Sequence, residues 1–159
     1  MIVVDDELGS ASAVKMSTAS VYKGSTAILT QALLSAAHFG VLEYVLDDLR
    51  LGTPELVARV ERRLASSATK ADRYVGEMHE IASTQAAAGL ERSLFEAMAQ
   101  VYARIAETQL ARGNPEGLPE ELSLDDVLGR LGERAVRSPN PESTPSPRAE
   151  PSPSQPPRS

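Results

Sequence analysis

The 159-residue sequence contains no cysteine and no tryptophan, and it has only two histidines and three lysines. Without cysteine the chain cannot form a disulfide, an iron–sulfur cluster or a thiolate zinc site. The net charge of -6 argues against nucleic acid or an anionic membrane as a partner. No apolar run approaches the roughly 20 residues that cross a bilayer, and the acidic start does not resemble a secretory signal. We therefore expect a soluble cytoplasmic protein.

Proline is also scarce except at the end of the chain. Eight of the eleven prolines lie in residues 137–159, where there is no large apolar residue. A segment with nothing to bury cannot offset the entropy lost on ordering, so we predict a disordered Pro/Ser-rich tail over 137–159. Its composition fits either a solubilising terminus or a segment that binds partner domains.

Residues 9–136 are rich in helix-forming residues, and their helix-breaking residues fall between apolar-periodic segments. The predicted fold class is therefore all-α, a multi-helix bundle with a long first helix. Glycines follow four of the predicted helices as stop signals, namely Gly40, Gly52, Gly89 and Gly113, and Thr53-Pro54 marks a helix start. The predicted helices cover residues 9–39, 41–50, 54–64, 69–88 and 92–111, with a short last helix opening at 123.

Apolar residues recur at helical spacing along the first predicted helix. Val14, Val21, Ile28 and Ala32 form one stripe, and Leu29, Leu33 and Ala37 widen it. We expect this apolar face to meet the other helices or a second copy of the chain. We expect three arginines of the predicted helix over residues 54–64 to lie at the surface instead, namely Arg59, Arg62 and Arg63. These arginines alternate with an acidic residue, which favours a solvated helix face over phosphate binding.

Two of the three lysines lie in the stretch GSASAVKMSTASVYKG, residues 9–24, among small side chains. Lys15, Thr18 and Tyr22 share one helix face because offsets of three and seven return to nearly the same angle. Small neighbours let a ligand approach closely, and a recessed lysine can act as an acid or a base. Lys15 and Lys23 are therefore either functional amines or ordinary solvated lysines, and spacing alone leaves both interpretations open.

This stretch resembles the start of the C-terminal helical domain of the β-hydroxyacid dehydrogenase superfamily, which includes 6-phosphogluconate dehydrogenase. It is most similar to the NAD(P)-binding phosphogluconate-dehydrogenase-like oxidoreductases. Against the superfamily pattern G-x-G-x-x-x-K-x-x-x-N, the register gives Gly9, Ala11, Lys15 and Ala19, so the first glycine and the lysine match. Residues 71–89, ADRYVGEMHEIASTQAAAG, are similar to that subfamily's Glu-Met helix ending in glycine. The likeness covers about residues 3–130.

The resemblance implies that Lys15 is the acid–base catalyst, which moves a proton on the substrate hydroxyl or carbonyl oxygen. We expect the small-molecule substrate to contact Thr18, Tyr22, Lys23 and Arg73. Ala19 replaces the superfamily's substrate-binding asparagine, so the usual hydroxy-acid contact is not expected. Tyr22 stands where 6-phosphogluconate dehydrogenase has a glutamate that aids decarboxylation, so we do not expect 6-phosphogluconate itself as the substrate. His79 and Glu80 follow Arg73 on the same predicted helix and are either further contacts or solvated surface residues.

The resemblance also implies an NADP or NAD cofactor, which the superfamily holds in a Rossmann domain. The sequence has no G-x-G-x-x-G between a strand and a helix. We therefore expect residues 1–8, with the short run Ile2-Val3-Val4, to be a remnant of the last Rossmann strand and its linker. Residues 9–136 would be the substrate-binding and dimerisation domain, inactive unless a separate chain supplies the Rossmann domain.

These observations leave two possible functions for the chain. In the first, the chain is the helical half of an NAD(P)-dependent oxidoreductase and forms a homodimer. In the second, it is a stand-alone helical interaction module that binds protein partners through its apolar stripes and its tail. The two differ at Lys15, which only the first function requires.

Overall fold

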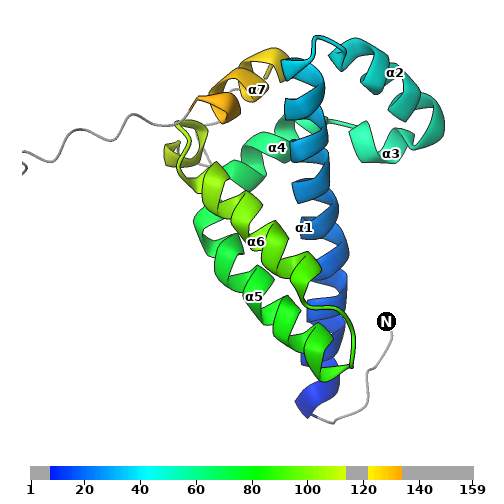
Figure 1. Cartoon of the computed structure of the whole chain (residues 1–159), viewed down its shortest axis with the longest axis vertical. Helices are drawn as coiled ribbons and strands as arrows, with labels where there is room; N and C mark the ends of the chain where they lie inside the picture. The colour runs from blue at the N-terminus through cyan, green and yellow to red at the C-terminus, as the bar shows by residue number, and fades with distance from the viewer. Residues whose placement is uncertain (1–7, 114–121, 134–159) are drawn as a thin grey trace, which may run out of the picture.

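The computed structural model describes residues 8–113 and 122–133, and this part of the chain is all-α, as predicted (Figure 1). The predicted strand remnant and the predicted tail lie outside the described residues. Within them there are α-helices, one 3-10 turn and no strand. The elements are α1 (Leu8–His38), α2 (Leu42–Gly52), α3 (Pro54–Val57), α4 (Val60–Ala68), α5 (Ala71–Ala87), α6 (Ser93–Ala106), η1 (Leu110–Arg112) and α7 (Leu124–Gly132).

Glycines end two of the helices where the sequence predicts. Gly40 has φ 69° after α1, and Gly89 has φ 74° after α5. In each case the amide beyond the glycine bonds back across the last turn, to the carbonyls of Ala36 and Gln85 at 2.9 Å. This 6→1 bond is the Schellman arrangement, which needs a left-handed residue that glycine adopts without strain. The local sequence therefore sets where these helices stop.

The prediction of one continuous helix over residues 54–64 is wrong, because the helix is interrupted between α3 and α4. Arg59 adopts a left-handed conformation with φ 52°, so the backbone turns before Val60 begins α4. The break allows α3 to pack with α2 while α4 packs separately against α1 and α7. The helix predicted to reach residue 111 also ends early, at Ala106. There Thr108 is buried and its hydroxyl bonds the Ile105 carbonyl at 2.7 Å, a local bond that competes with continued helix.

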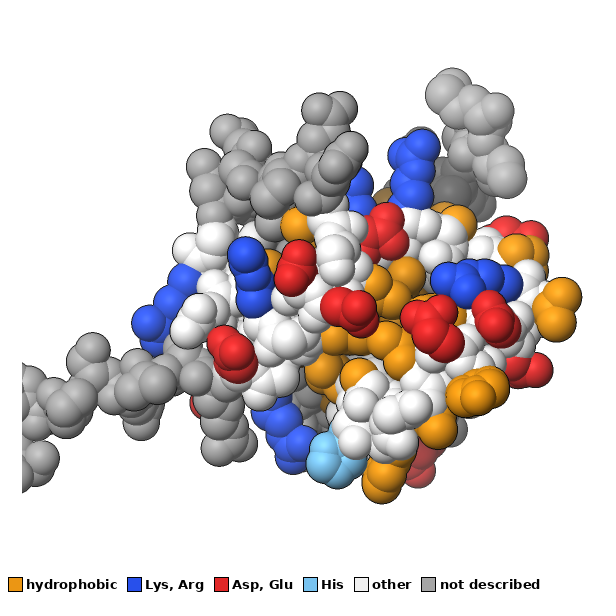
Figure 2. Space-filling model, turned by 90° about the horizontal axis from the view of Figure 1, so that it is seen from above, with side chains coloured by type: hydrophobic (Ala, Val, Ile, Leu, Met, Phe, Trp, Pro, Cys, Tyr) orange, Lys and Arg blue, Asp and Glu red, His pale blue; other side chains and the backbone are white. Residues whose placement is uncertain are grey.

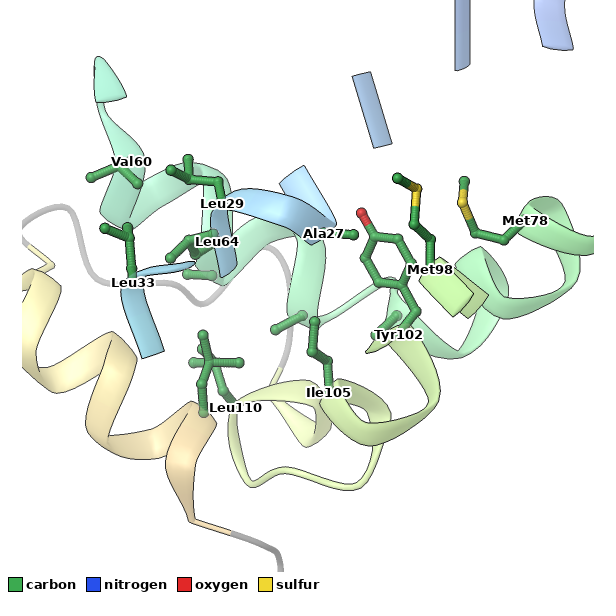
Figure 3. Packing of buried hydrophobic residues seen from close by; sticks show 14 of the residues in the cluster. Ala27, Leu29, Leu33, Val60, Leu64, Met78, Met98, Tyr102, Ile105 and Leu110 are labelled. Carbon is green, nitrogen blue, oxygen red and sulfur yellow. The ribbon is translucent and has the colours of Figure 1, made fainter. Parts of the chain in front are cut away.

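α1 is the spine of the molecule, and α5 and α6 lie side by side along it (Figure 1). The core forms where α1, α4, α5 and α6 meet, around fully buried Leu33, Leu64 and Tyr102 (Figure 3). One contact between α1 and α6 lies at a glycine of α1. A Cβ on Gly24 would lie 3.2 Å from the Met98 sulfur of α6, so the missing side chain sets the spacing of the two helices.

The apolar face predicted along the first helix is covered only in part: Leu29 and Leu33 are buried, whereas its line of Val14, Val21 and Ile28 is exposed. Val14, Val21 and Ile28 are 50%, 66% and 60% exposed. The side of α1 that the other helices cover carries a different set of buried residues, namely Met16, Thr26, Ala27, Leu29, Thr30, Leu33 and Ala36. Several members of that set are small or polar, so α1 packs by close approach on one side and leaves Val14, Val21 and Ile28 uncovered.

α2 and α3 form an arm that stands off the bundle at the end of α1 (Figure 1). Only Leu46 of α2 and Val57 of α3 are buried in it. On this end face, hydrophobic side chains gather in a hollow with acidic side chains around it (Figure 2). Tyr44 and Leu51 of α2 are 79% and 88% exposed, so the arm has an apolar outer surface as well. No described helix is long and apolar enough to cross a membrane.

Candidate functional site

A groove of about 310 Å³ runs between the N-terminal half of α1 and α5. It brings together three of the five predicted site residues, Lys15 and Lys23 of α1 and Arg73 of α5. Those lysines and that arginine are 50 or more positions apart in the chain, so only the packing of α5 on α1 joins them. The other lining residues are Met16, Ala19, Gly76, Glu77, Glu80 and Ile81.

Small residues open the groove, and buried apolar residues form its floor. Ala19 faces it from α1, and a Cβ added at Gly76 of α5 would meet nothing within 4 Å. Met16 and Ile81 are buried beneath. An apolar floor with a few polar groups converging above it is the usual composition of a small-molecule site.

One carboxylate organises the two inner cations. Lys23 pairs with Glu77, and the Arg73 Nε lies 3.4 Å from the other oxygen of the same carboxylate. The Lys23 Nζ also lies 4.8 Å from the centre of the Tyr74 ring, where the face of the ring attracts a cation. With Glu80 included, the groove carries three cations against two carboxylates in a chain of net charge -6. The groove is thus locally positive.

Lys15 differs from Lys23 in its surroundings. It is exposed at the edge of the groove, and it forms no ion pair with any residue in the described ranges 8–113 and 122–133. The recess expected around it is therefore open on one side. Its amine can meet a ligand that lies in the groove, and its catalytic role stays a prediction.

The other two predicted contacts, Thr18 and Tyr22, do not line this groove. Thr18 is exposed, and Tyr22 is 69% exposed beside a second hollow of about 260 Å³. Lys23 and Tyr74 line that second hollow as well. Tyr22 and Lys15 do share a side of α1 as predicted, but they border neighbouring hollows separated by the Lys23 side chain.

Arg63 of α4 lines the second hollow, and its predicted place on a solvated face is wrong. Its guanidinium donates to the Thr26 and Ser25 hydroxyls at 2.8 and 2.6 Å, and to the Leu56 carbonyl at 3.2 Å. These bonds join α4 and α3 to the middle of α1. The alternation of charges in the sequence gives no sign of this role, because the acceptors on α1 lie up to 41 positions away.

The sequence analysis also missed Tyr102 and Glu77, which both contact Lys23. The Tyr102 hydroxyl donates to the backbone carbonyl of Lys23 at 2.7 Å, and its ring packs edge-on against Tyr74 with centroids 5.2 Å apart. Burial raises the pKa of Tyr102 well above its usual range. Glu77 follows Arg73 by four positions, a helical pairing that the sequence does contain. The Tyr102 contact to Lys23 spans 79 positions and has no sequence signal.

Comparison with known protein families gives one match. Residues 36–105 match a family described as a domain of unknown function (DUF1932). That domain occurs at the C-terminus of NAD(P)-binding 3-hydroxyisobutyrate-dehydrogenase-like proteins, which agrees with the resemblance at the coarse level of a dehydrogenase-like C-terminal domain. The matched segment includes Arg73, Glu77 and Glu80 but not the two lysines of α1. No curated protein matches the chain, and no solved structure matches it.

The described residues do not fit the nicotinamide cofactor that such proteins bind. A dinucleotide site needs a glycine-rich turn between a strand and a helix, and the described part of the chain has no strand. Nor does that part contain a group of three or more His, Asp or Glu side chains arranged to hold a metal ion. The chemistry that the described groove itself offers is binding and proton transfer by side chains.

Proposed function

We propose that this chain is the substrate-binding half of an NAD(P)-dependent oxidoreductase that acts on a hydroxyl group or the corresponding carbonyl. The observation that carries the proposal is the α1–α5 groove. It joins Lys15, from the segment that resembles the superfamily's lysine motif, to Arg73, from the segment within the matched family domain. The groove thus lies between the lysine segment of the resemblance and the matched family domain.

The three cations of the groove have different tasks in this proposal. Lys23 and Arg73 are held by Glu77, so they provide a fixed positive wall for an anionic or strongly polar group of the substrate. Lys15 has no such partner among the described residues. Its ammonium donates a proton to a substrate carbonyl oxygen as that oxygen becomes a hydroxyl, and its free amine accepts the proton in the reverse direction.

The nicotinamide cofactor, which supplies or accepts the hydride, is held by a Rossmann domain outside the described residues. The groove residues bind the substrate, orient it and move its proton. Calorimetric titration of the chain with NADPH should show no binding. A micromolar dissociation constant would contradict the assignment of cofactor binding to a separate Rossmann domain.

The catalytic assignment is tested by supplying a cofactor domain. The nucleotide-binding domain of a 3-hydroxyisobutyrate-dehydrogenase-like protein that carries the matched domain is fused ahead of α1, and NADPH oxidation is followed with a panel of small carbonyl compounds. Loss of a general acid–base group costs roughly 10²- to 10⁴-fold in rate, so Lys15→Ala should lower kcat by at least 100-fold with little change in KM. Lys23→Ala should instead raise KM.

The chain offers a matched control because it has only one other lysine. Lys70, which donates to the Ser66 hydroxyl at 3.1 Å, does not line the groove, so Lys70→Ala should leave kcat unchanged. Equal activity of the Lys15→Ala and Lys70→Ala fusions would refute the role of Lys15. It would favour the stand-alone interaction module instead.

A further inference from the structure

The second hollow, of about 260 Å³, lies beside the substrate groove where α1, α4 and α5 meet. Two tyrosines, two cations and three hydroxyl side chains line it, and none of the described residues that line it is acidic. Lys23 lines the groove as well, so the two hollows adjoin at its side chain. An apolar cavity of about 150 Å³ can hold benzene, so the second hollow has room for an aromatic ring.

The hydroxyl groups around the second hollow already have partners within the protein. The Thr26 hydroxyl donates to the Tyr22 carbonyl at 2.8 Å and accepts from Arg63 at 2.8 Å. The Ser67 hydroxyl donates to the Leu64 carbonyl at 2.8 Å. A polar or anionic ligand group would give up its water here without finding free partners, which costs free energy. The second hollow therefore favours an apolar group of a ligand.

The tyrosines and cations of the second hollow favour an aromatic group over an aliphatic one. Tyr22 enters the hollow from α1 and Tyr74 from α5. The Lys23 Nζ lies 4.8 Å from the centre of the Tyr74 ring, so this ammonium already contacts one aromatic face. A ligand ring in the hollow would pair with the tyrosine rings and be attracted to Lys23 and Arg63, whereas an aliphatic group has no such quadrupole.

We propose that the second hollow binds an aromatic ring of the substrate, and that the substrate is therefore an extended aryl carbonyl compound. This inference rests on the proposed function, which places the reacting carbonyl at Lys15. Tyr22 follows Lys15 by about two turns, or about 10 Å along α1, so a chain of several atoms separates the ring from the carbonyl. That chain passes Lys23, where an acidic group on it meets the positive wall that Lys23 and Arg73 form.

The first experiment measures binding to the full chain by calorimetry, with acids that have no ketone or aldehyde to reduce. The probes are phenylbutanoate, with its ring at the far end from the carboxylate, cyclohexylbutanoate and butanoate. Phenylbutanoate should bind at least about tenfold more tightly than either of the others. Equal affinities for the phenyl and cyclohexyl acids, or no binding of any probe at about 1 mM, would overturn the aromatic subsite.

A substitution then locates the ring in the second hollow. Tyr22 is 69% exposed, so Tyr22→Ala removes one wall of the hollow without opening the core. This variant should lose most of the preference for phenylbutanoate, to about threefold or less, and should bind butanoate as the wild type does. Tyr44→Ala, at a 79% exposed position on α2, is the matched control and should keep the full preference. Circular dichroism checks that both variants are folded, and wild-type affinity of Tyr22→Ala for phenylbutanoate would refute the assignment.

The same probes separate this inference from the proposed function. Lys15→Ala should bind phenylbutanoate within about twofold of the wild type, because the ring and the carboxylate contact other residues. If phenylbutanoate binds as expected but the Lys15→Ala fusion keeps its activity, the aromatic subsite is supported and the catalytic role of Lys15 is refuted. If the fusion requires Lys15 but has equal KM values for aryl and aliphatic carbonyl compounds, the proposed function is supported and the aromatic subsite is refuted.

Discussion

Removal of the Tyr102 hydroxyl tests whether the core below the groove is held as the structure shows. In Tyr102→Phe the ring and its edge-on contact with Tyr74 stay, and only the bond to the Lys23 carbonyl is lost. Lys23 lies inside α1, so its carbonyl keeps its helical partner and the loss is that of one hydrogen bond, about 1 kcal/mol. With a urea m-value of about 1–3 kcal/mol/M, the unfolding midpoint at pH 7 should fall by roughly 0.3–1 M.

The effect should reverse at high pH. Tyr102 is fully buried, and this burial raises its pKa, so the folded state keeps the proton to a higher pH than the unfolded chain, whose tyrosines titrate near 10. The stability linked to this proton is complete below about pH 10 and then declines by about 1.4 kcal/mol per pH unit until the folded-state pKa is reached. Tyr102→Phe has no proton to lose, so the variant and the wild type should become equally stable between about pH 10 and 11.

Urea unfolding at several pH values between 8 and 11 measures this crossing. The other three tyrosines are common to both proteins, so their titration cancels in the difference. Tyr44→Phe, on the exposed outer face of α2, is the control and should follow the wild type throughout. If the wild-type and Tyr102→Phe curves stay parallel up to pH 11, Tyr102 is not buried as a neutral donor and the description of the site's support is wrong.

Two further predictions concern the break between α3 and α4 and its anchor. Arg59→Gly should leave stability unchanged or raise it by up to about 1 kcal/mol, because glycine adopts the left-handed conformation freely, whereas Arg62→Gly inside α4 should cost about 0.5–1 kcal/mol. Thermal unfolding of both variants checks this, and equal losses would show that the break is not strained. Arg63→Ala should cost about 2–3 kcal/mol because it removes charged donors from the Thr26 and Ser25 hydroxyls. Arg63→Lys should recover less than half of that in urea unfolding, since one ammonium cannot reach both acceptors; full recovery would contradict the forked geometry.

Much of the helical architecture could be predicted because its signals are local. Gly40 and Gly89 stop α1 and α5 through bonds within one turn, and the Ser123 hydroxyl caps α7 by accepting from the Asp126 amide at 3.3 Å. The break at Arg59 could not be predicted in the same way. Val57, Val60 and Leu64 keep helical spacing across it, so the pattern indicates one helix while packing against two different neighbours requires two.

The candidate site, like the fold, could be predicted from the sequence only in part. The sequence singled out Lys15, Lys23 and Arg73 by their residue types and neighbours, and α5 packing on α1 placed them in one groove. Glu77 and Tyr102, which fix Lys23 in place, act over 54 and 79 positions. Contacts at such separations depend on how the helices pack, which a local pattern does not contain.

The sequence by itself determined that this protein is helical and which residues share each helix face. The tertiary structure alone decided which of those faces is covered. Helical periodicity gives the relative angles of Val14, Val21 and Ile28, but the direction of the core is set by where α5 and α6 approach, and α6 contacts α1 on the side of Gly24. Of the apolar face that the pattern marked on the first helix, Leu29 and Leu33 are therefore buried while Val14, Val21 and Ile28 lie on the surface, because the covered side depends on how whole helices pack.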